Sequence, residues 1–304
     1  MKIGIAVGDI WRPATFEELI GQARAAVELG FGTVWAAQAL GWDALTALTA
    51  VGCHVPDVQL GTAVVPVAQR HPLVLAGQAL SVQAATGDRL TLGVGAGIGM
   101  MVRTMYGLPA DRPVRRMREY LEVLRPLLRG ESVAHQGETL TAAGAVEVPG
   151  ARPPQVLLAA LGPAMLALAG ELADGVVTWM TGPRTLAGHI VPAVTKAADS
   201  AGRPAPRVVA GLLVCVTDDV AGARERAAER FGLAGRVPEY RAVLDREGVD
   251  GPQDVVVAGD EEAVAAQLGR LAEAGVGECM AVPFGTEEEW RRTTEVLGRW
   301  SGPA

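Results

Sequence analysis

A glycine-rich segment is the first candidate for ligand binding in the sequence. Gly95, Ala96 and Gly97 lie in the run GVGAGIG, directly after an apolar stretch. Glycine lets the backbone approach a ligand closely, and successive backbone N–H groups can bind an anion. Alone, the run is equally typical of a tight exit from a strand.

A second segment has the same character. Leu161, Gly162 and Pro163 follow another apolar stretch, at the point where a helix is expected to begin. The N-terminus of a helix offers unpaired N–H groups and a positive dipole end, which suit a phosphate. Two such segments in one chain favour a ligand with an anionic group more than either does alone.

Three tryptophans and a methionine follow predicted strands. Aromatic residues make up only 4% of the chain, yet Trp11, Trp42 and Trp179 all fall at such positions, and Met180 is next to the last of them. They predict an apolar, aromatic-walled cleft for a flat ring system, where a substrate would bind. Ordinary packing of loops is the alternative interpretation.

Residues that other enzyme classes need are scarce or badly spaced. None of the four serines lies in a G-x-S-x-G motif, and lysine occurs only at Lys2 and Lys196, which disfavours a serine hydrolase and Schiff-base chemistry. The histidines and cysteines show no H-x-x-x-H or C-x-x-C spacing, so no metal is expected. The net charge of −7 without a basic tract disfavours nucleic acid as a partner.

The sequence favours a cytoplasmic protein. No run of about 18 apolar residues is present, so no membrane partner is expected. The N-terminal residues MKIGIAVGDIW are typical of a strand and not of a signal peptide. Cys53, Cys215 and Cys279 are far apart in apolar runs, as expected for unpaired thiols in a reducing compartment.

Short apolar strands alternate with longer amphipathic helices along the chain. Strands that are apolar on both faces indicate a parallel sheet covered by helices. Eight strand–helix units, without the G-x-G-x-x-G motif of a doubly wound sheet, predict a (β/α)₈ TIM barrel that forms a single domain over 1–304. The predicted strands are 2–8, 33–37, 58–65, 89–95, 155–161, 175–180, 207–216 and 278–284.

Two insertions interrupt this alternation. Residues 96–113 follow the fourth strand, and residues 130–154, which resemble a small hairpin, precede the fifth. Loops that follow barrel strands form the catalytic end, so 96–113 is expected to overhang that end and 130–154 to lie at the other.

Four segments together resemble the bacterial luciferase-like superfamily and, within it, coenzyme F420-dependent oxidoreductases of actinobacterial type. The segments are 30–48, 60–97, 171–186 and 257–284. The most specific part is the combination of GTAVVP, the His-Pro pair that follows it, and LTLGVGAG. The resemblance implies a TIM barrel that binds a deazaflavin at its C-terminal mouth. It also implies hydride transfer between C5 of the deazaflavin and a small organic substrate. Besides this substrate, a second copy of the chain in a homodimer is a possible partner.

The resemblance also implies roles for particular residues. A non-prolyl cis peptide between Ala63 and Val64 would back the deazaflavin ring. The loops at Gly95–Ala96–Gly97 and Leu161–Gly162–Pro163 would hold its side chain and phosphate. Gly97→Val is therefore expected to obstruct the cofactor while leaving the fold intact.

The chain departs from its sugar-phosphate dehydrogenase relatives. These carry an Asp-His pair after the second strand and an acid after the glycine-rich loop, where this chain has Gln38, Ala39 and Ile98. Sugar-phosphate activity is thus disfavoured, and Gln38 is left as the candidate catalytic residue, able to hydrogen-bond a ring or substrate oxygen. Two alternatives stay open: an FMN-dependent monooxygenase of the same superfamily, and a non-catalytic ligand-binding barrel.

Overall fold

The strands and helices alternate along most of the chain. The computed structural model describes residues 1–8 and 14–300. The strands are β1 (Lys2–Ala6), β2 (Thr33–Ala36), β3 (Gln59–Thr62), β4 (Val65–Pro66), β5 (Leu90–Gly95), β6 (Val133–Gln136), β7 (Thr141–Gly144), β8 (Gln155–Ala159), β9 (Gly175–Trp179), β10 (Arg207–Val216), β11 (Val257–Gly259) and β12 (Glu278–Pro283). The α-helices are α1 (Phe16–Glu28), α2 (Ala44–His54), α3 (Pro72–Thr86), α4 (Gly99–Tyr106), α5 (Pro113–Leu128), α6 (Pro163–Leu172), α7 (Pro183–Thr185), α8 (Val191–Ser200), α9 (Val220–Phe231), α10 (Pro238–Glu247), α11 (Glu261–Glu273) and α12 (Glu287–Trp300).

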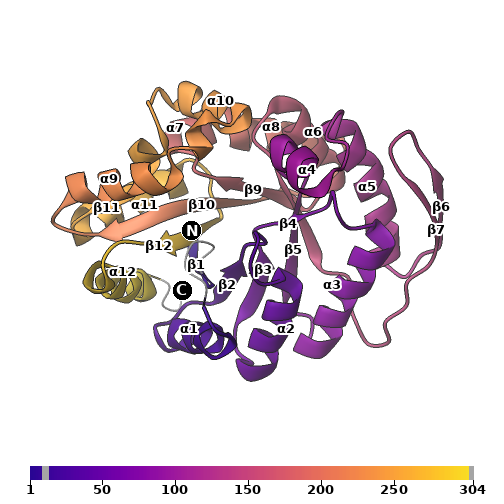
Figure 1. Cartoon of the computed structure of the whole chain (residues 1–304), viewed down its shortest axis with the longest axis horizontal. Helices are drawn as coiled ribbons and strands as arrows, with labels where there is room; N and C mark the ends of the chain where they lie inside the picture. Colours follow the sequence, from indigo (N-terminus) through magenta and orange to yellow (C-terminus); the bar gives the residue numbers. More distant parts are fainter. Residues whose placement is uncertain (9–13, 301–304) are drawn as a thin grey trace.

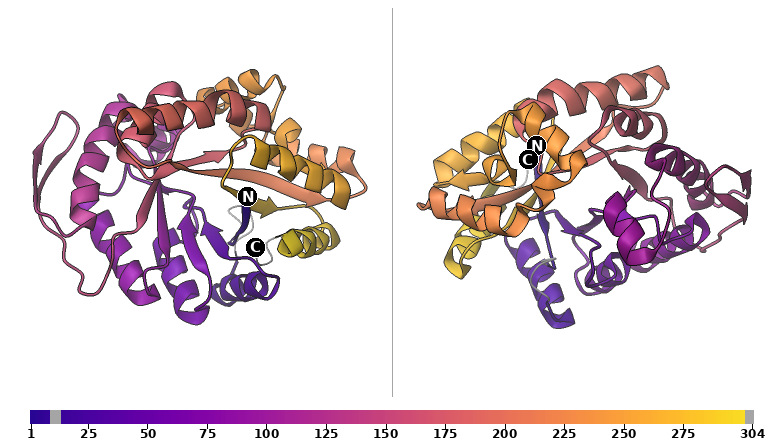
Figure 2. Two further views of the ribbon diagram at one scale, coloured as in Figure 1. Left: turned by 180° about the vertical axis from the view of Figure 1, so that it is seen from behind. Right: turned by 45° about the horizontal axis from the view of Figure 1, so that its top comes forward.

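Eight parallel strands close into a barrel. Their order is β10, β12, β1, β2, β3, β5, β8 and β9, and β9 pairs again with β10. Helices surround the strands, and β11 extends the sheet outside the barrel next to β10 (Figures 1 and 2). The predicted (β/α)₈ barrel is confirmed, as is an insertion at each of the two predicted places. No helix of the described part of the chain is long and apolar enough to cross a membrane.

Large side chains fill the barrel because glycines face them. The interior cluster consists of Trp35, Leu157, Val177, Val209 and Met280. A Cβ atom at Gly61 would lie 2.3 Å from the Trp35 ring, and one at Gly211 would lie 2.5 Å from Met280 Cε. The missing side chains thus make room for the large ones, and the interior is a packed core rather than a channel.

A polar network closes the N-terminal end of the barrel. Arg207 donates to Glu278 (2.5 Å), Thr91 (3.1 Å) and Gln155 (3.1 Å), and its guanidinium lies over the Trp35 ring. Trp35 Nε1 donates to the other Glu278 oxygen at 2.9 Å. The Glu278 side chain is only 2% exposed. This end of the barrel is therefore occupied by buried side chains that bond one another, and the ends of the strands opposite to it are the place to look for a ligand site.

The 130–154 insertion is an antiparallel hairpin, β6–β7, that packs outside α3 and α5 (Figure 1). The buried carboxylate of Glu119 on α5 accepts hydrogen bonds from the backbone of Glu138 and Thr139 in its turn. His71, which caps the N-terminus of α3, bonds the carbonyl of Thr141 at 3.0 Å. The prediction that the whole insertion lies at the far end is wrong. Glu138 in the turn pairs with Arg112 and Arg115 at the start of α5, and Thr141 of β7 contacts the N-cap residue of α3. Both helices begin at the catalytic end, because they follow barrel strands.

Candidate active site at the carboxyl end of the barrel

Half-buried apolar side chains form a floor at the carboxyl end of the barrel. Ala63, Val64, Ala159, Trp179 and Val282 pack on the interior cluster, yet each keeps part of its surface exposed. We call these five residues the apolar floor. They come from four places in the barrel (the β3–β4 connection and the ends of β8, β9 and β12), so the closed sheet is what assembles them. Such a surface suits a flat, apolar ring.

The glycine-rich segment borders this floor. A Cβ atom at Gly95 would lie 2.9 Å from Val64 Cγ2 and 3.1 Å from Ala159 Cβ, so the floor has no room for one. Ala96 is half-buried beside it, and Gly97 has a φ of +79°, which favours glycine. The predicted close approach of the backbone to a ligand agrees with this geometry and stays a prediction.

The β3–β4 connection has the peptide geometry that the resemblance implies. The bond between Ala63 and Val64 is cis, which confirms that prediction. The backbone N–H of Gln38 donates to the Val64 carbonyl at 3.4 Å. The loop after β2 is thereby tied to the edge of the apolar floor.

Two helices present their N-termini at this end without a capping side chain. Helix α4 begins after Ile98 and α6 begins after Gly162, and neither has a side-chain cap. Nothing lies within 4 Å of the Cβ position at Gly162, while the carbonyl of Leu161 accepts a hydrogen bond from His189 at 3.1 Å. Free N–H groups at a helix start bind anions, so these loops suit the phosphate of a flavin-type cofactor.

The neighbouring α7 differs from α4 and α6, because its N-terminal N–H groups already have a side-chain partner that the sequence did not reveal. The Glu247 carboxylate from α10 accepts hydrogen bonds from the backbone N–H groups of Arg184 (3.1 Å) and Thr185 (2.7 Å). These amides are already satisfied by a carboxylate of the protein. The sequence does not predict this contact, because Glu247 lies more than 60 positions from Arg184 and Thr185 and no local motif links them.

The predicted aromatic wall is assembled only in part. Trp179 lies on the apolar floor, 6.1 Å from the Phe231 ring between centroids. Met180, with a φ of +50°, is instead buried in a separate cluster around Leu213. Its side chain is only 2% exposed, because the chain turns directly after β9.

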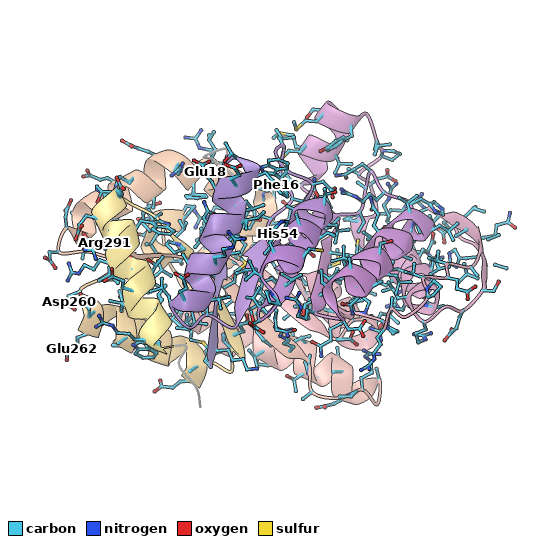
Figure 3. All side chains as sticks on the ribbon, turned by 90° about the horizontal axis from the view of Figure 1, so that it is seen from below. Phe16, Glu18, His54, Asp260, Glu262 and Arg291 are labelled. Carbon is cyan, nitrogen blue, oxygen red and sulfur yellow. The ribbon has the colours of Figure 1, made fainter. Side chains whose placement is uncertain are left out.

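Trp42 contacts the outer helices rather than the apolar floor. Its ring lies 5.9 Å from Phe16, which in turn packs on His54, and its Nε1 donates to the carbonyl of Ala14. Figure 3 shows Phe16 and His54 on the neighbouring helices α1 and α2. Trp11 lies outside the described residues. For Trp11, Trp42 and Met180 a substrate contact stays a prediction.

A polar network that the sequence did not reveal surrounds Gln38. Its Oε1 accepts hydrogen bonds from the backbone N–H of Ala44 (2.9 Å) and from Arg70 Nη2 (3.3 Å). The same Arg70 nitrogen pairs with Asp43, the N-cap residue of α2. Burial raises the pKa of Asp43, but hydrogen bonds from Thr46 and the charge of Arg70 outweigh it, so its pKa lies below the usual value.

Comparison with known proteins supports the resemblance. Residues 4–291 match the family model of the luciferase-like monooxygenases. A putative coenzyme F420-dependent oxidoreductase of Mycobacterium tuberculosis is 30% identical over 272 residues, which cover 84% of this chain and 76% of the relative. A 5,10-methylenetetrahydromethanopterin reductase of Archaeoglobus fulgidus is 30% identical over 258 residues, with 82% and 74% covered.

Solved structures share the fold. An F420-dependent secondary alcohol dehydrogenase in complex with an F420-acetone adduct superposes with a TM-score of 0.82 at 19% identity, covering 98% of each chain. The oxygenating constituent of a Pseudomonas putida 3,6-diketocamphane monooxygenase in complex with FMN gives a TM-score of 0.77 at 18% identity, covering 98% of this chain and 97% of that one.

Proposed function

The chain belongs to the luciferase-like monooxygenase family, and on that basis we propose that it is an oxidoreductase that transfers a hydride between C5 of coenzyme F420 and a small organic substrate. The observation that carries the proposal is the pairing of the apolar floor with the uncapped N-termini of α4 and α6. A flat ring and an anionic side chain are the two parts of a deazaflavin cofactor, and each has a matching surface here. Relatives named as F420-dependent favour this coenzyme.

The residues present are compatible with the cofactor. The missing side chain at Gly95 leaves Val64 and Ala159 as a level surface for the ring, and a methyl group there would collide with both. Gly162 adds no side chain before α6, so the first N–H groups of that helix are accessible. The coenzyme would supply the redox chemistry, and this chain would bind it, orient it and exclude water from one face.

Gln38 and Trp179 would act on the substrate. Gln38 lies beside Val64 through its backbone, and its side chain is half-buried at the same end of the barrel. Trp179 would contact an apolar part of the substrate from the opposite side of the floor. Binding in a defined orientation is the main contribution that such groups make to hydride transfer.

An FMN-dependent monooxygenase is the second candidate, since a structural neighbour contains FMN. Both cofactors carry a phosphorylated side chain, so the phosphate loops do not discriminate between them. Titration of the protein with F420 and with FMN, followed by fluorescence, tests the proposal: tighter binding of F420 supports it. Micromolar binding of FMN without binding of F420 would overturn it.

A further inference from the structure

The orientation of the Gln38 side-chain amide is set by two obligate donors. A backbone N–H and a guanidinium N–H can only donate, and both point at the same Gln38 atom, so that atom is the oxygen. The Nε2 group is therefore turned away from Ala44 and Arg70. It makes no hydrogen bond to any described residue and is not buried, which leaves two N–H donors free.

Arg70 is itself held firmly in place. Its side chain is 12% exposed, and it pairs with Asp43 while it donates to Gln38. The Arg70 guanidinium thus ties the segment between β4 and α3 to the loop after β2, and Gln38 lies on that loop. Without it, only the Ala44 N–H would hold the Gln38 oxygen, and the amide could rotate.

We propose that Arg70 is a positioning residue that fixes Gln38 as a hydrogen-bond donor, and that the site is therefore built to bind and reduce a carbonyl compound. This rests on the proposed function. A donor at this place stabilises negative charge that develops on a carbonyl oxygen. An amide oxygen is not a base, and the Gln38 oxygen already accepts two hydrogen bonds, so Gln38 can act on a substrate oxygen only as a donor.

The reaction balances without another reactant. A hydride adds to the electrophilic carbon of the carbonyl compound and forms a C–H bond. The π electrons move to the oxygen, which takes a proton from solvent. The substrate gains two electrons and the reduced deazaflavin loses them together with the C5–H bond.

Gln38→Glu is the sharpest test. A carboxylate keeps an oxygen for the Ala44 N–H and for Arg70, but has no N–H left to donate. We expect the variant to fold, to bind F420 within about threefold of the parent, and to lose about 5- to 150-fold in kcat/KM for 2-cyclohexen-1-one as the probe, since one hydrogen bond to the developing charge is lost. Gln22→Glu is the matched control: Gln22 Oε1 also accepts a backbone N–H, from Gly8 at 2.9 Å, and this change should leave the rate as in the parent.

A spectroscopic measurement separates donation from a general structural effect. With the protein loaded with oxidised F420, no turnover occurs, and the infrared carbonyl stretch of bound 2-cyclohexen-1-one should lie at lower frequency than in water-free solvent. Gln38→Glu should remove this shift while the Gln22→Glu control keeps it. An unshifted carbonyl in the parent, or an equal shift in Gln38→Glu, overturns the proposal.

The role of Arg70 is tested by a double-mutant cycle. Arg70→Met should lower the rate with 2-cyclohexen-1-one in the parent but not in the Gln38→Glu background, because Arg70 acts through Gln38. Arg70→Lys, which keeps one donor, should recover part of the rate and also serves if Arg70→Met does not fold. Equal losses in both backgrounds would show that Arg70 acts independently of Gln38. If F420 does not bind the parent at all, the proposed function itself fails, which is a different result from loss of the probe alone.

Discussion

Replacement of Gly95 by alanine tests whether the apolar floor carries the cofactor ring. The added methyl group would lie 2.9 Å from Val64 Cγ2 and 3.1 Å from Ala159 Cβ, whereas carbon atoms prefer about 3.5–4.0 Å. Neither neighbour can move easily, since Val64 is β-branched and Ala159 has only its Cβ. To relieve these two short contacts, the backbone at Gly95 and the neighbouring residues of the apolar floor would have to shift by several tenths of an ångström.

Overpacking of this kind costs about 1–3 kcal/mol. If the ring lies on the floor, we expect that cost to appear largely in binding, as a 5- to 150-fold higher dissociation constant for F420. The assay is quenching of F420 fluorescence on titration with protein. Gly21→Ala on α1 is the control, because its Cβ would meet nothing within 4 Å. A folded Gly95→Ala protein with the affinity of the parent would refute the placement of the ring.

The same reasoning changes the expectation for Gly97→Val. Gly97 has a φ of +79°, a conformation that costs a residue with a side chain about 1–2 kcal/mol and a β-branched one more. The expectation that this variant leaves the fold intact stays a prediction, but the substitution adds backbone strain to any obstruction of the site. Loss of cofactor binding by Gly97→Val would not separate obstruction from backbone strain, and Gly95→Ala is the better variant.

Three further outcomes are expected. Trp179→Ala should raise KM for 2-cyclohexen-1-one by about 10- to 100-fold, with a smaller change in kcat, because apolar contact surface is lost; steady-state kinetics measure this, and an effect on kcat alone would contradict it. Glu278→Gln should lower the melting temperature by about 6–10 °C, since it removes the buried carboxylate charge that pairs with Arg207, yet leave F420 affinity unchanged; a change in affinity would show that the closed end is not independent of the site. Burial raises the pKa of Glu119, but hydrogen bonds from Thr139, Glu138 and Arg115 outweigh it and lower the pKa to about 2. Its contribution, up to about 3 kcal/mol, is present above about pH 4.5 and is lost as the pH falls towards 2; in denaturant unfolding between pH 6 and 3, Glu119→Gln should therefore lose less stability than the parent, and equal losses would contradict this.

The barrel was predictable because its signals are local. Thr15 and Glu18 have the T-x-x-E spacing of a capping box and start α1, and Asp43 is a typical N-cap residue and caps α2. Elements with weak local signals were missed. Helix α4 has only one buried residue, Val102, and so lacks a clear apolar stripe; β11 has three residues.

The candidate site was predictable only where the backbone determines it. The cis peptide between Ala63 and Val64 follows from the family resemblance and is confirmed, whereas the cofactor role of the glycine loops, inferred from their motifs, stays a prediction. Side chains are harder, because a position after a strand does not say which way the chain turns. Met180 shows this, since a positive φ directs it into a separate core. The contact of Arg70 with Gln38 joins residues 32 positions apart and leaves no pattern in the sequence.

The central claim is that the carboxyl end of the barrel binds F420. Its most direct test is a parallel titration of the purified protein with F420 and with FMN, in which the fluorescence of each cofactor is followed to saturation. The account predicts that F420 binds more tightly than FMN, and that Gly95→Ala weakens it while Gly21→Ala does not. Micromolar binding of FMN with no binding of F420 would contradict the account.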